Sequence, residues 1–351
     1  MTGRKLIPFL LVAFPAGLLA IGVTSMVNSH LQKAKGPQDP NEQVRLEAAS
    51  LNQEPVSRET LERHIRILCE TIGERHVGKM NQLEQAAFWI ESSLGPTNLG
   101  YVVKREEYEL ASSFAENGKP HRVRNLVAEL PGMALRDEII IVGAHYDTVP
   151  GSPGANDNGS GVAALISIAQ ALAGEQQQRT IRFVAFANEE PPYFQTKEMG
   201  SWVHARGCAE REEKIVAMIA FDGLGYFTDE PNSQEVPPGL EGVFPKEGNF
   251  LAFVANENSR FLGDQAKRVF EGVSGIPAVG GVFPESIPGV GWSDHWSFWQ
   301  EGFPAIMVTD TIPFRYEHYH KPTDTVDQLD MEQLEFVVKG LEEVIRSWAN
   351  P

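Results

Sequence analysis

The chain alternates short apolar runs with segments whose apolar residues recur at helical spacing, and this alternation limits the folds open to it. Several runs are apolar throughout, as in strands that are covered on both faces of a sheet. Helical patterns lie between them, so we predict an α/β fold with a mixed, mostly parallel central sheet and helices on both faces. The expected strands cover residues 101–108, 125–130, 139–143, 180–187, 215–221, 251–255 and 305–308.

Helices and long connections separate the expected strands. Ser57 is expected to cap an amphipathic first helix, because serine accepts a hydrogen bond from the first turn. Residues 223–250 and 274–292 are rich in Gly and Pro, and we expect irregular connections there with a role in function. The remaining helices are expected over residues 83–94, 161–172, 259–271 and 331–348.

An uncharged apolar stretch at residues 6–27 directly follows Arg4 and Lys5. At about 1.5 Å per residue it is long enough to cross a hydrocarbon core of about 30 Å. A cleaved signal peptide would have an apolar region of about 7–15 residues and a small-x-small cleavage site. We therefore expect an uncleaved signal anchor over residues 1–30, with the rest of the chain on the extracytoplasmic side, periplasmic or extracellular. The alternative is a cleaved signal and a secreted protein.

The composition of the chain after the expected anchor limits its organisation and its partners. Residues 31–55 are polar and proline-containing and are interpreted as a tether, and residues 56–351 as one catalytic domain. The formal net charge of −17 argues against a nucleic-acid partner. With only Cys69 and Cys208, the chain has neither a disulfide scaffold nor a thiolate zinc finger.

Side chains of the types that bind metals follow several predicted strands. In open α/β sheets ligands bind outside the carboxyl ends of the strands, so we expect these side chains to share one edge of the sheet. A further candidate lies in a glycine-rich turn before a helix, and two histidines lie near the C-terminus. The candidates are His145, Asp147, Asp157, Glu189, Glu190, Asp222, His318 and His320.

Each of these residues taken singly has a structural interpretation. A histidine at a strand end is more often a hydrogen-bonded structural residue, and Asp157 could cap the following helix. Together, two histidines and at least three carboxylates form a nitrogen and oxygen ligand set that suits Zn²⁺ without cysteine. The carboxylates outnumber the ligands of one tetrahedral zinc, which favours two metal ions that share a carboxylate, with one glutamate left as a base.

Five motifs in a fixed order, GAHYD, PGANDNGSG, FANEE, FDGLG and YHKPTDT, resemble those of metallopeptidase family M28. This family comprises co-catalytic zinc exopeptidases of the leucyl-aminopeptidase-like group. The resemblance extends from about Arg75 to the C-terminus and covers the expected catalytic domain. It implies the zinc exopeptidase fold, which is phosphorylase/hydrolase-like, peptide substrates and two Zn²⁺ ions.

The resemblance also implies roles for individual residues. Glu189 corresponds to the general acid/base, and Asp147 to the carboxylate that orients the imidazole of His145. Asn156 stands where the family often has Asp, at a position that does not bind metal. The implied ligands are His145 and Asp222 for one zinc ion, Glu190 and His320 for the other, and Asp157 as the bridge.

Several assignments keep an alternative. His318 is the alternative to His320, although the pattern H-x-x-x-D-T selects His320. In residues 292–299, Asp294 and His295 are candidates for supporting the ligands or contacting substrate, and the alternative is an aromatic helix packed on the sheet.

Two residues beside these motifs are weaker candidates. Tyr319 could donate a hydrogen bond to the tetrahedral intermediate or be a buried structural tyrosine. Arg315 is expected to be structural.

The implied chemistry is peptide hydrolysis. The zinc ions would lower the pKa of a water to about 7, and Glu189 would take its proton and return it to the departing amine. We predict an aminopeptidase. The alternatives are a glutaminyl cyclase, which is an acyltransferase of the same fold with one zinc, and a carboxypeptidase, because the motifs do not specify which peptide end is recognised. A non-catalytic ectodomain is disfavoured because every ligand position and the base are present.

Overall fold

The computed structural model describes residues 57–111 and 121–351. The predicted anchor over residues 1–30 and the tether over residues 31–55 lie outside the described residues, so both stay predictions. In the part of the chain that is described, no helix combines the length and the apolar character that a membrane span requires.

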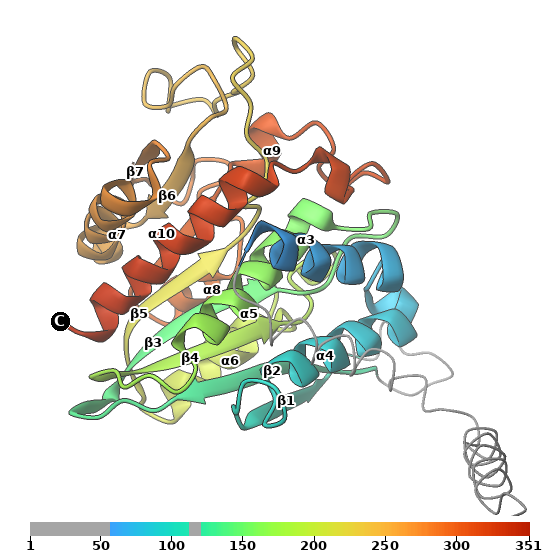
Figure 1. Cartoon of the computed structure of the whole chain (residues 1–351), viewed down its shortest axis with the longest axis vertical. Helices are drawn as coiled ribbons and strands as arrows, with labels where there is room; N and C mark the ends of the chain where they lie inside the picture. Colours follow the sequence, from blue (N-terminus) through green and yellow to red (C-terminus); the bar gives the residue numbers. More distant parts are fainter. Residues whose placement is uncertain (1–56, 112–120) are drawn as a thin grey trace, which may run out of the picture. The chain divides into compact units, whose positions relative to one another are not determined.

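Among the described residues, eight strands form one sheet in the order β1-β2-β4-β3-β5-β8-β6-β7 (Figure 1). The central strands β4, β3, β5 and β8 are parallel, and β2 and β6 flank them as antiparallel neighbours. The predicted mixed, mostly parallel sheet is therefore confirmed. The strands are β1 Val103–Glu109, β2 Arg122–Leu130, β3 Leu135–His145, β4 Arg179–Phe186, β5 Lys214–Phe221, β6 Leu251–Ala255, β7 Ala278–Val282 and β8 Ala305–Thr309.

Helices cover both faces of the sheet, as predicted (Figure 1). One hydrophobic cluster joins the sheet to α3, α4, α5, α7 and α10, and a second cluster joins the other face to α6 and α8. The helices are α3 Arg58–Arg66, α4 Met80–Leu94, α5 Gly161–Leu172, α6 Gly200–Glu210, α7 Arg260–Ser274, α8 His295–Gln300, α9 Ile312–Arg315 and α10 Met331–Ala349, and a π-helical turn, Ile67–Ile72, continues α3.

Strand β3 shows why the central runs are apolar throughout. Ile140 and Val142 pack in the first cluster, whereas Ile139 and Ile141 pack in the second. Successive side chains of a strand point to opposite faces, so a strand covered on both faces buries every residue. Each fully buried aliphatic side chain contributes about 1.5–3 kcal/mol relative to exposure. Cys69 and Cys208 lie in different clusters and are both free thiols.

The first helix begins where the sequence predicts. The Ser57 hydroxyl accepts from the backbone N–H of Thr60, and the Thr60 hydroxyl oxygen accepts from the Ser57 N–H. This reciprocal pair satisfies two amide groups that would otherwise lack partners at the helix start. The helical segment ends at Gly73, whose φ of 81° is in the left-handed region.

The prediction of an irregular connection over residues 274–292 is wrong in part. Residues Ala278–Val282 form β7, an edge strand parallel to β6. A Cβ on Gly280 would lie 2.2 Å from the Phe253 carbonyl oxygen, so the close approach of the two strands requires glycine there. The glycines that suggested a loop are therefore part of the strand, where they allow β7 to pair closely with β6. Residues 223–250 do lack helix and strand, as predicted.

Candidate metal centre

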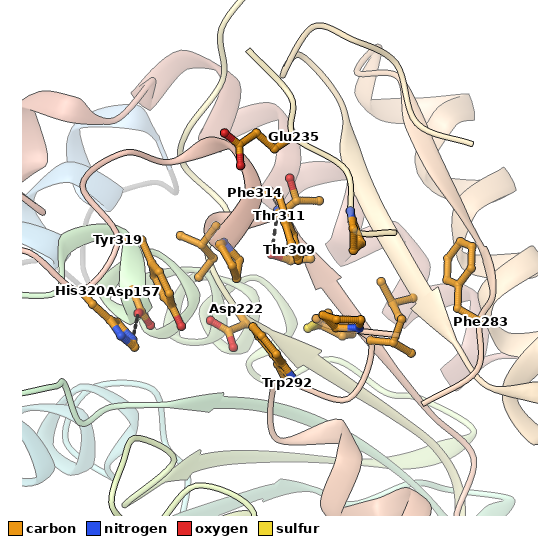
Figure 2. Close-up of a pocket in the computed structure, with 18 of the residues that line it drawn as sticks. Asp157, Asp222, Glu235, Phe283, Trp292, Thr309, Thr311, Phe314, Tyr319 and His320 are labelled. Atoms are coloured by element: carbon orange, nitrogen blue, oxygen red, sulfur yellow. Dashed lines mark hydrogen bonds and ion pairs between the residues drawn. The ribbon is translucent and has the colours of Figure 1, made fainter. Parts of the chain in front are cut away.

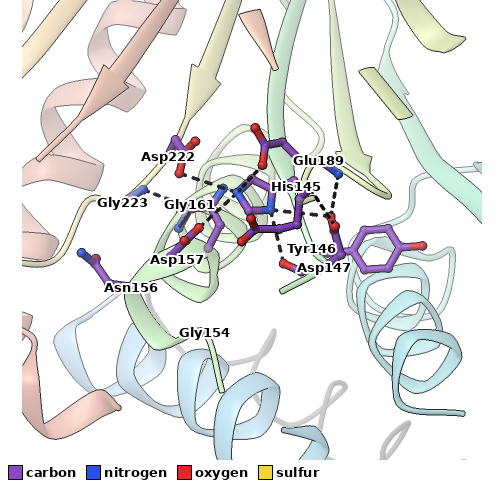
Figure 3. Close-up of polar contacts among 12 residues, drawn as sticks. His145, Tyr146, Asp147, Gly154, Asn156, Asp157, Gly161, Glu189, Asp222 and Gly223 are labelled. Carbon is purple, nitrogen blue, oxygen red and sulfur yellow. Dashed lines mark hydrogen bonds and ion pairs between the residues drawn. The ribbon is translucent and has the colours of Figure 1, made fainter. Parts of the chain in front are cut away.

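The predicted ligands lie together at the carboxyl ends of the central parallel strands. His145 is the last residue of β3, and Asp222 directly follows β5. Glu189 and Glu190 follow β4 after two intervening residues. Asp157 projects from the turn that precedes α5, and Figure 3 shows its carboxylate converging with His145, Asp222 and Glu189. The rule that ligands bind outside strand carboxyl ends therefore located the centre.

The carboxylate of Asp157 faces a different histidine with each oxygen. Its Oδ1 lies 3.3 Å from Nε2 of His145, and its Oδ2 lies 3.2 Å from Nε2 of His320. Asp222 Oδ1 lies 3.6 Å from the same nitrogen of His145, and Glu190 Oε2 lies 3.2 Å from that of His320. Asp157 thus occupies the bridging position between two groups of ligand atoms.

The donor set has the properties of a metal site. Four of its atoms are buried and have no hydrogen-bond partner among the described residues: Nε2 of His145, Nε2 of His320, Oδ1 of Asp222 and Oε1 of Glu190. A buried polar atom without a partner costs about 1–3 kcal/mol. Three groups of these side chains place one atom each within 4.8 Å of one another: His145, Asp157 and Asp222; Asp157, Glu190 and His320; and His145, Glu189 and Glu190. Imidazole nitrogens and carboxylate oxygens in this number fit zinc.

Burial and neighbouring charges shift the pKa values of Glu189, Glu190 and His320. Burial and the charge of Asp157 raise the pKa of Glu190 to about 8. Burial, opposed by the nearby His145, raises the pKa of Glu189 well above its usual range. Although burial opposes it, pairing with Asp157 and Glu190 raises the pKa of His320 to about 10. These shifts favour protonated carboxyl groups here, and a divalent cation would replace those protons.

Asp147 joins the ligand His145 to the segment that carries the glutamates. Its two carboxylate oxygens accept the backbone N–H groups of Glu189 and Glu190, each at 3.1 Å, and Figure 3 shows the first of these contacts. Its Oδ1 lies 3.6 Å from Nδ1 of His145, on the side of the ring away from Asp157. The placement fits the predicted orienting role and adds a second one, support of the glutamate segment.

His318 and His320 make different contacts, and so do Asp294 and His295. His318 contacts Thr323 through Nδ1 at 2.9 Å, while His320 contacts Asp157 and Glu190. Asp294 is fully buried near Glu189, and burial raises its pKa to about 7. His295 begins α8 and pairs through Nε2 with the carbonyl of Val290, at 2.8 Å, so it supports a connection rather than a ligand.

Tyr319 lines the pocket, whereas Arg315 does not. The Tyr319 ring stacks on His320 with 3.7 Å between ring centroids and lines the pocket. Arg315 instead donates to the carbonyls of Gly248 and Phe250, each at 2.9 Å, behind the wall. Arg315 is therefore structural, as expected. Asp157 does not cap α5, whose N-cap is Ser160, so that alternative is wrong.

Four of the five proposed ligands, all but His145, line one pocket of about 240 Å³ that extends far beyond them. We call its two parts the acidic end, with Asp157, Glu189, Glu190, Asp222 and His320, and the apolar end, with Leu240, Phe244, Val254, Phe283, Val290 and Met307. Figure 2 shows Phe283 on the opposite side of the pocket from His320. Both long connections, residues 223–250 and 274–292, contribute to the lining, as their predicted role in function requires.

Three charged residues at the centre escaped the sequence analysis. Asp310 directly follows β8 and accepts from the Asn156 amide and the Tyr226 N–H, each at 2.8 Å. The strand-end rule applied to residues 305–308 would have found it. Arg75 and Asp324 contact the turn that carries Asp157, although Asp324 lies within the YHKPTDT motif. Their side chains form hydrogen bonds with backbone groups of this turn, and the spacing of residues in the sequence does not indicate such contacts.

Comparison with known proteins gives consistent results. The model of "Peptidase family M28" matches residues 125–345. The chain is 34% identical to the uncharacterized protein YfbL of Escherichia coli, over 81% of this chain and 86% of that protein. It is 27% identical to leucine aminopeptidase 1 of Arthroderma otae over 72% of this chain, and it spans 64% of the length of that relative.

Solved structures share the fold. A zinc aminopeptidase from Bacillus subtilis superposes with a TM-score of 0.66 at 16% identity, covering 84% of this chain and 96% of that one. A glutaminyl cyclase from Fimbriiglobus ruber superposes with a TM-score of 0.60 at 22% identity, with the same coverage of 84% and 96%. At these identities the similarity establishes the shared architecture alone.

Proposed function

Because the chain belongs to peptidase family M28, we propose that it is a zinc-dependent aminopeptidase that removes N-terminal residues from peptides. Family membership confirms the predicted metallopeptidase class and the predicted fold. The choice of the amino end, the number of zinc ions and the location in the cell are proposals, and each has its own support.

The charge of the pocket is the observation that supports recognition of an amino group. Five carboxylates line the pocket, four of them at the acidic end and the fifth on Glu235. Among the described residues that line it there is no Lys or Arg. A protonated N-terminal amine is complementary to these carboxylates, whereas a C-terminal carboxylate would meet repulsion and no guanidinium or ammonium partner. The carboxypeptidase alternative is disfavoured for this reason.

The ligand geometry supports two zinc ions. His145 and Asp222 would hold one ion, Glu190 and His320 the other, and Asp157 would bridge them, since its two oxygens face the two histidines. Bound zinc lowers the pKa of a water and polarises the substrate carbonyl. A glutaminyl cyclase with one zinc would need only part of this set, which favours the peptidase over that alternative.

Glu189 is the base in this proposal. Its carboxylate is buried in the pocket wall with Oε2 3.9 Å from Nε2 of His145, and no ligand role is assigned to it. The carboxylate would take the proton of the attacking water and return it to the departing amine. Asp147 fixes the Glu189 backbone by accepting its N–H, which directs the side chain toward the substrate.

The proposal includes a membrane anchor over residues 1–30 with the catalytic domain on the extracytoplasmic side. Its support is the uncharged stretch at residues 6–27, which is long enough to span a bilayer. Peptides are the proposed partners, and the net charge of −17 argues against nucleic acid. Recovery of the full-length chain in the membrane fraction, protected from alkaline extraction, is the expected result.

The function is tested with zinc analysis of the purified full-length protein and a panel of three peptide classes. We expect bound zinc and hydrolysis of peptides with a free N-terminal amine, with release of the first residue. The same sequences with an acetylated amine serve as the control and should stay intact. Cleavage of only the peptides with an acetylated amine would contradict the aminopeptidase proposal. Cyclisation of N-terminal glutaminyl peptides without hydrolysis would identify the cyclase instead.

A further inference from the structure

Arg75 is a buried cation without an acidic partner. Its side chain is fully buried, and no carboxylate in the described ranges forms an ion pair with it. The guanidinium instead donates to five backbone carbonyls, those of Leu68, Gly73, Tyr146, Pro153 and Gly154, at 2.6–3.2 Å. Burying a charge is costly unless every donor is satisfied, so this position of the arginine needs a structural reason.

The five carbonyls belong to three segments that meet at the acidic end. Leu68 lies in the last turn of the first helical segment and Gly73 caps its C-terminus, where the helix dipole favours a cation. Tyr146 lies between His145 and Asp147 at the exit of β3. Pro153 and Gly154 lead into Asp157. The Arg75 side chain therefore connects the segment of one proposed ligand, His145, to the segment of the next, Asp157.

Asp324 holds the same turn through three further hydrogen bonds. Its Oδ1 accepts the backbone N–H of Asn156 at 2.8 Å, and its Oδ2 accepts that of Asp157 at 3.2 Å. Its backbone carbonyl accepts the N–H of Ala155 at 3.2 Å. Asp324 follows His320 by four residues, so it connects the Asp157 segment to the segment of the second histidine.

The turn packs tightly against Thr148 and Arg75 at Gly154. Gly154 has a φ of 64°, and a Cβ there would lie 2.4 Å from Thr148 Cγ2 and 3.0 Å from Nη2 of Arg75. A side chain at this position would push the turn away from Arg75. The local sequence is therefore adapted to the contact with the guanidinium.

We propose that Arg75 and Asp324 are positioning residues, which fix the backbone around Asp157 so that its two oxygens face His145 and His320. Neither side chain binds zinc. Their contribution is to zinc affinity, because a carboxylate that must serve two ions loses both contacts when its backbone shifts. The inference rests on the proposed zinc site.

The test measures zinc affinity of the full-length protein by competition with a chelator, without substrate. The variants are Arg75→Met and Asp324→Asn, and the matched control is Arg182→Met. Arg182 is also buried, but it pairs with Glu129 and Glu213 and lies in β4, four residues before the strand ends. We expect zinc affinity to fall about 10–100-fold in both variants. The control should keep its affinity within about twofold, although metal-free Arg182→Met should unfold at a lower temperature than the unaltered chain because it loses both ion pairs.

Each outcome decides the inference. Zinc affinity in both variants within twofold of the control would overturn it while the proposed function stands. If Arg75→Met does not fold, Asp324→Asn decides alone, because Asn is nearly isosteric but cannot accept both N–H groups with one oxygen. Failure of the unaltered chain to bind zinc would overturn the proposed function and this inference together. The kcat of the zinc-saturated variants should recover toward the unaltered value, which a loss of folded protein would not allow.

Discussion

The acidic end and the apolar end of the pocket are built in different ways. The acidic end takes Glu189, Glu190 and Asp222 from the carboxyl ends of β4 and β5. Asp157 comes from one turn held by Arg75 and Asp324, and His320 comes from the segment after α9. The apolar end takes Leu240 and Phe244 from the connection after β5, and Phe283 from the residue after β7. Most of the carboxylates at the acidic end are thus attached to the sheet, whereas the surface that would select substrates belongs largely to connections.

The two ends also differ in how they depend on the core. The apolar end is continuous with the second hydrophobic cluster, which contains Leu240, Phe283 and Met307. The acidic end contains buried polar atoms that have no partner among the described residues, and a bound cation would satisfy them. A substitution at one end should therefore leave the other end unaffected.

The largest expected effect is at the acidic end. Glu189→Gln should lower kcat by about 10²–10⁴-fold, because the amide cannot take the proton of the attacking water. Zinc content should be unchanged, since Glu189 is not an assigned ligand. Steady-state kinetics and metal analysis measure the two quantities. Glu257→Gln, an exposed glutamate paired with Arg260, is the control. Full activity of Glu189→Gln would show that the base is another residue.

Acid should destabilise the fold through a histidine in the helix that packs against the turn of Asp157. His64 lies in α3, which contacts the segment Ala155–Ser160. Burial and the charge of Arg63 lower the pKa of His64 to about 4. In the unfolded chain the pKa is about 6.5, so between these values the unfolded state binds a proton that the folded state does not. Stability should therefore fall as pH decreases from about 6.5 to about 4, by up to about 3 kcal/mol.

The variant His64→Met separates this contribution from other titrations. Urea unfolding of the metal-free protein at several pH values gives the free energy of unfolding of both chains. We expect the difference between them to change across the window from about 6.5 to about 4 and to be constant above it. A difference that does not depend on pH would contradict the assignment to His64.

The smallest expected effect is at the apolar end. Leu240→Ala should lower kcat/KM for peptides that begin with a large apolar residue by about tenfold, because lost apolar contact in such a pocket is worth about 1–3 kcal/mol. Peptides that begin with alanine are the internal control and should be cleaved as before. Zinc affinity should not change. Equal losses for both peptide classes would mean that the two ends are not independent.

The sequence predicted the acidic end well because strand exits obey a simple rule. His145, Asp222 and the two glutamates follow buried strands, and apolar runs of this kind are read directly from the chain. Strand β7 was missed because Gly280 permits close strand pairing, which leaves the same signature as a loop. Arg75 and Asp324 act on backbone atoms distant in sequence, and the apolar end depends on connections whose path no periodic pattern specifies.

The residues that form and support the acidic end are spread over most of the described chain, from Arg75 to Asp324. During synthesis, a growing chain that lacks residues 320–324 contains Asp157 and His145 but neither the second histidine nor the carboxylate that holds the turn. Contacts of such long sequence separation form slowly, because loop closure costs entropy. A chain that stops before residue 320 therefore cannot complete the proposed metal centre, because it carries neither His320 nor Asp324.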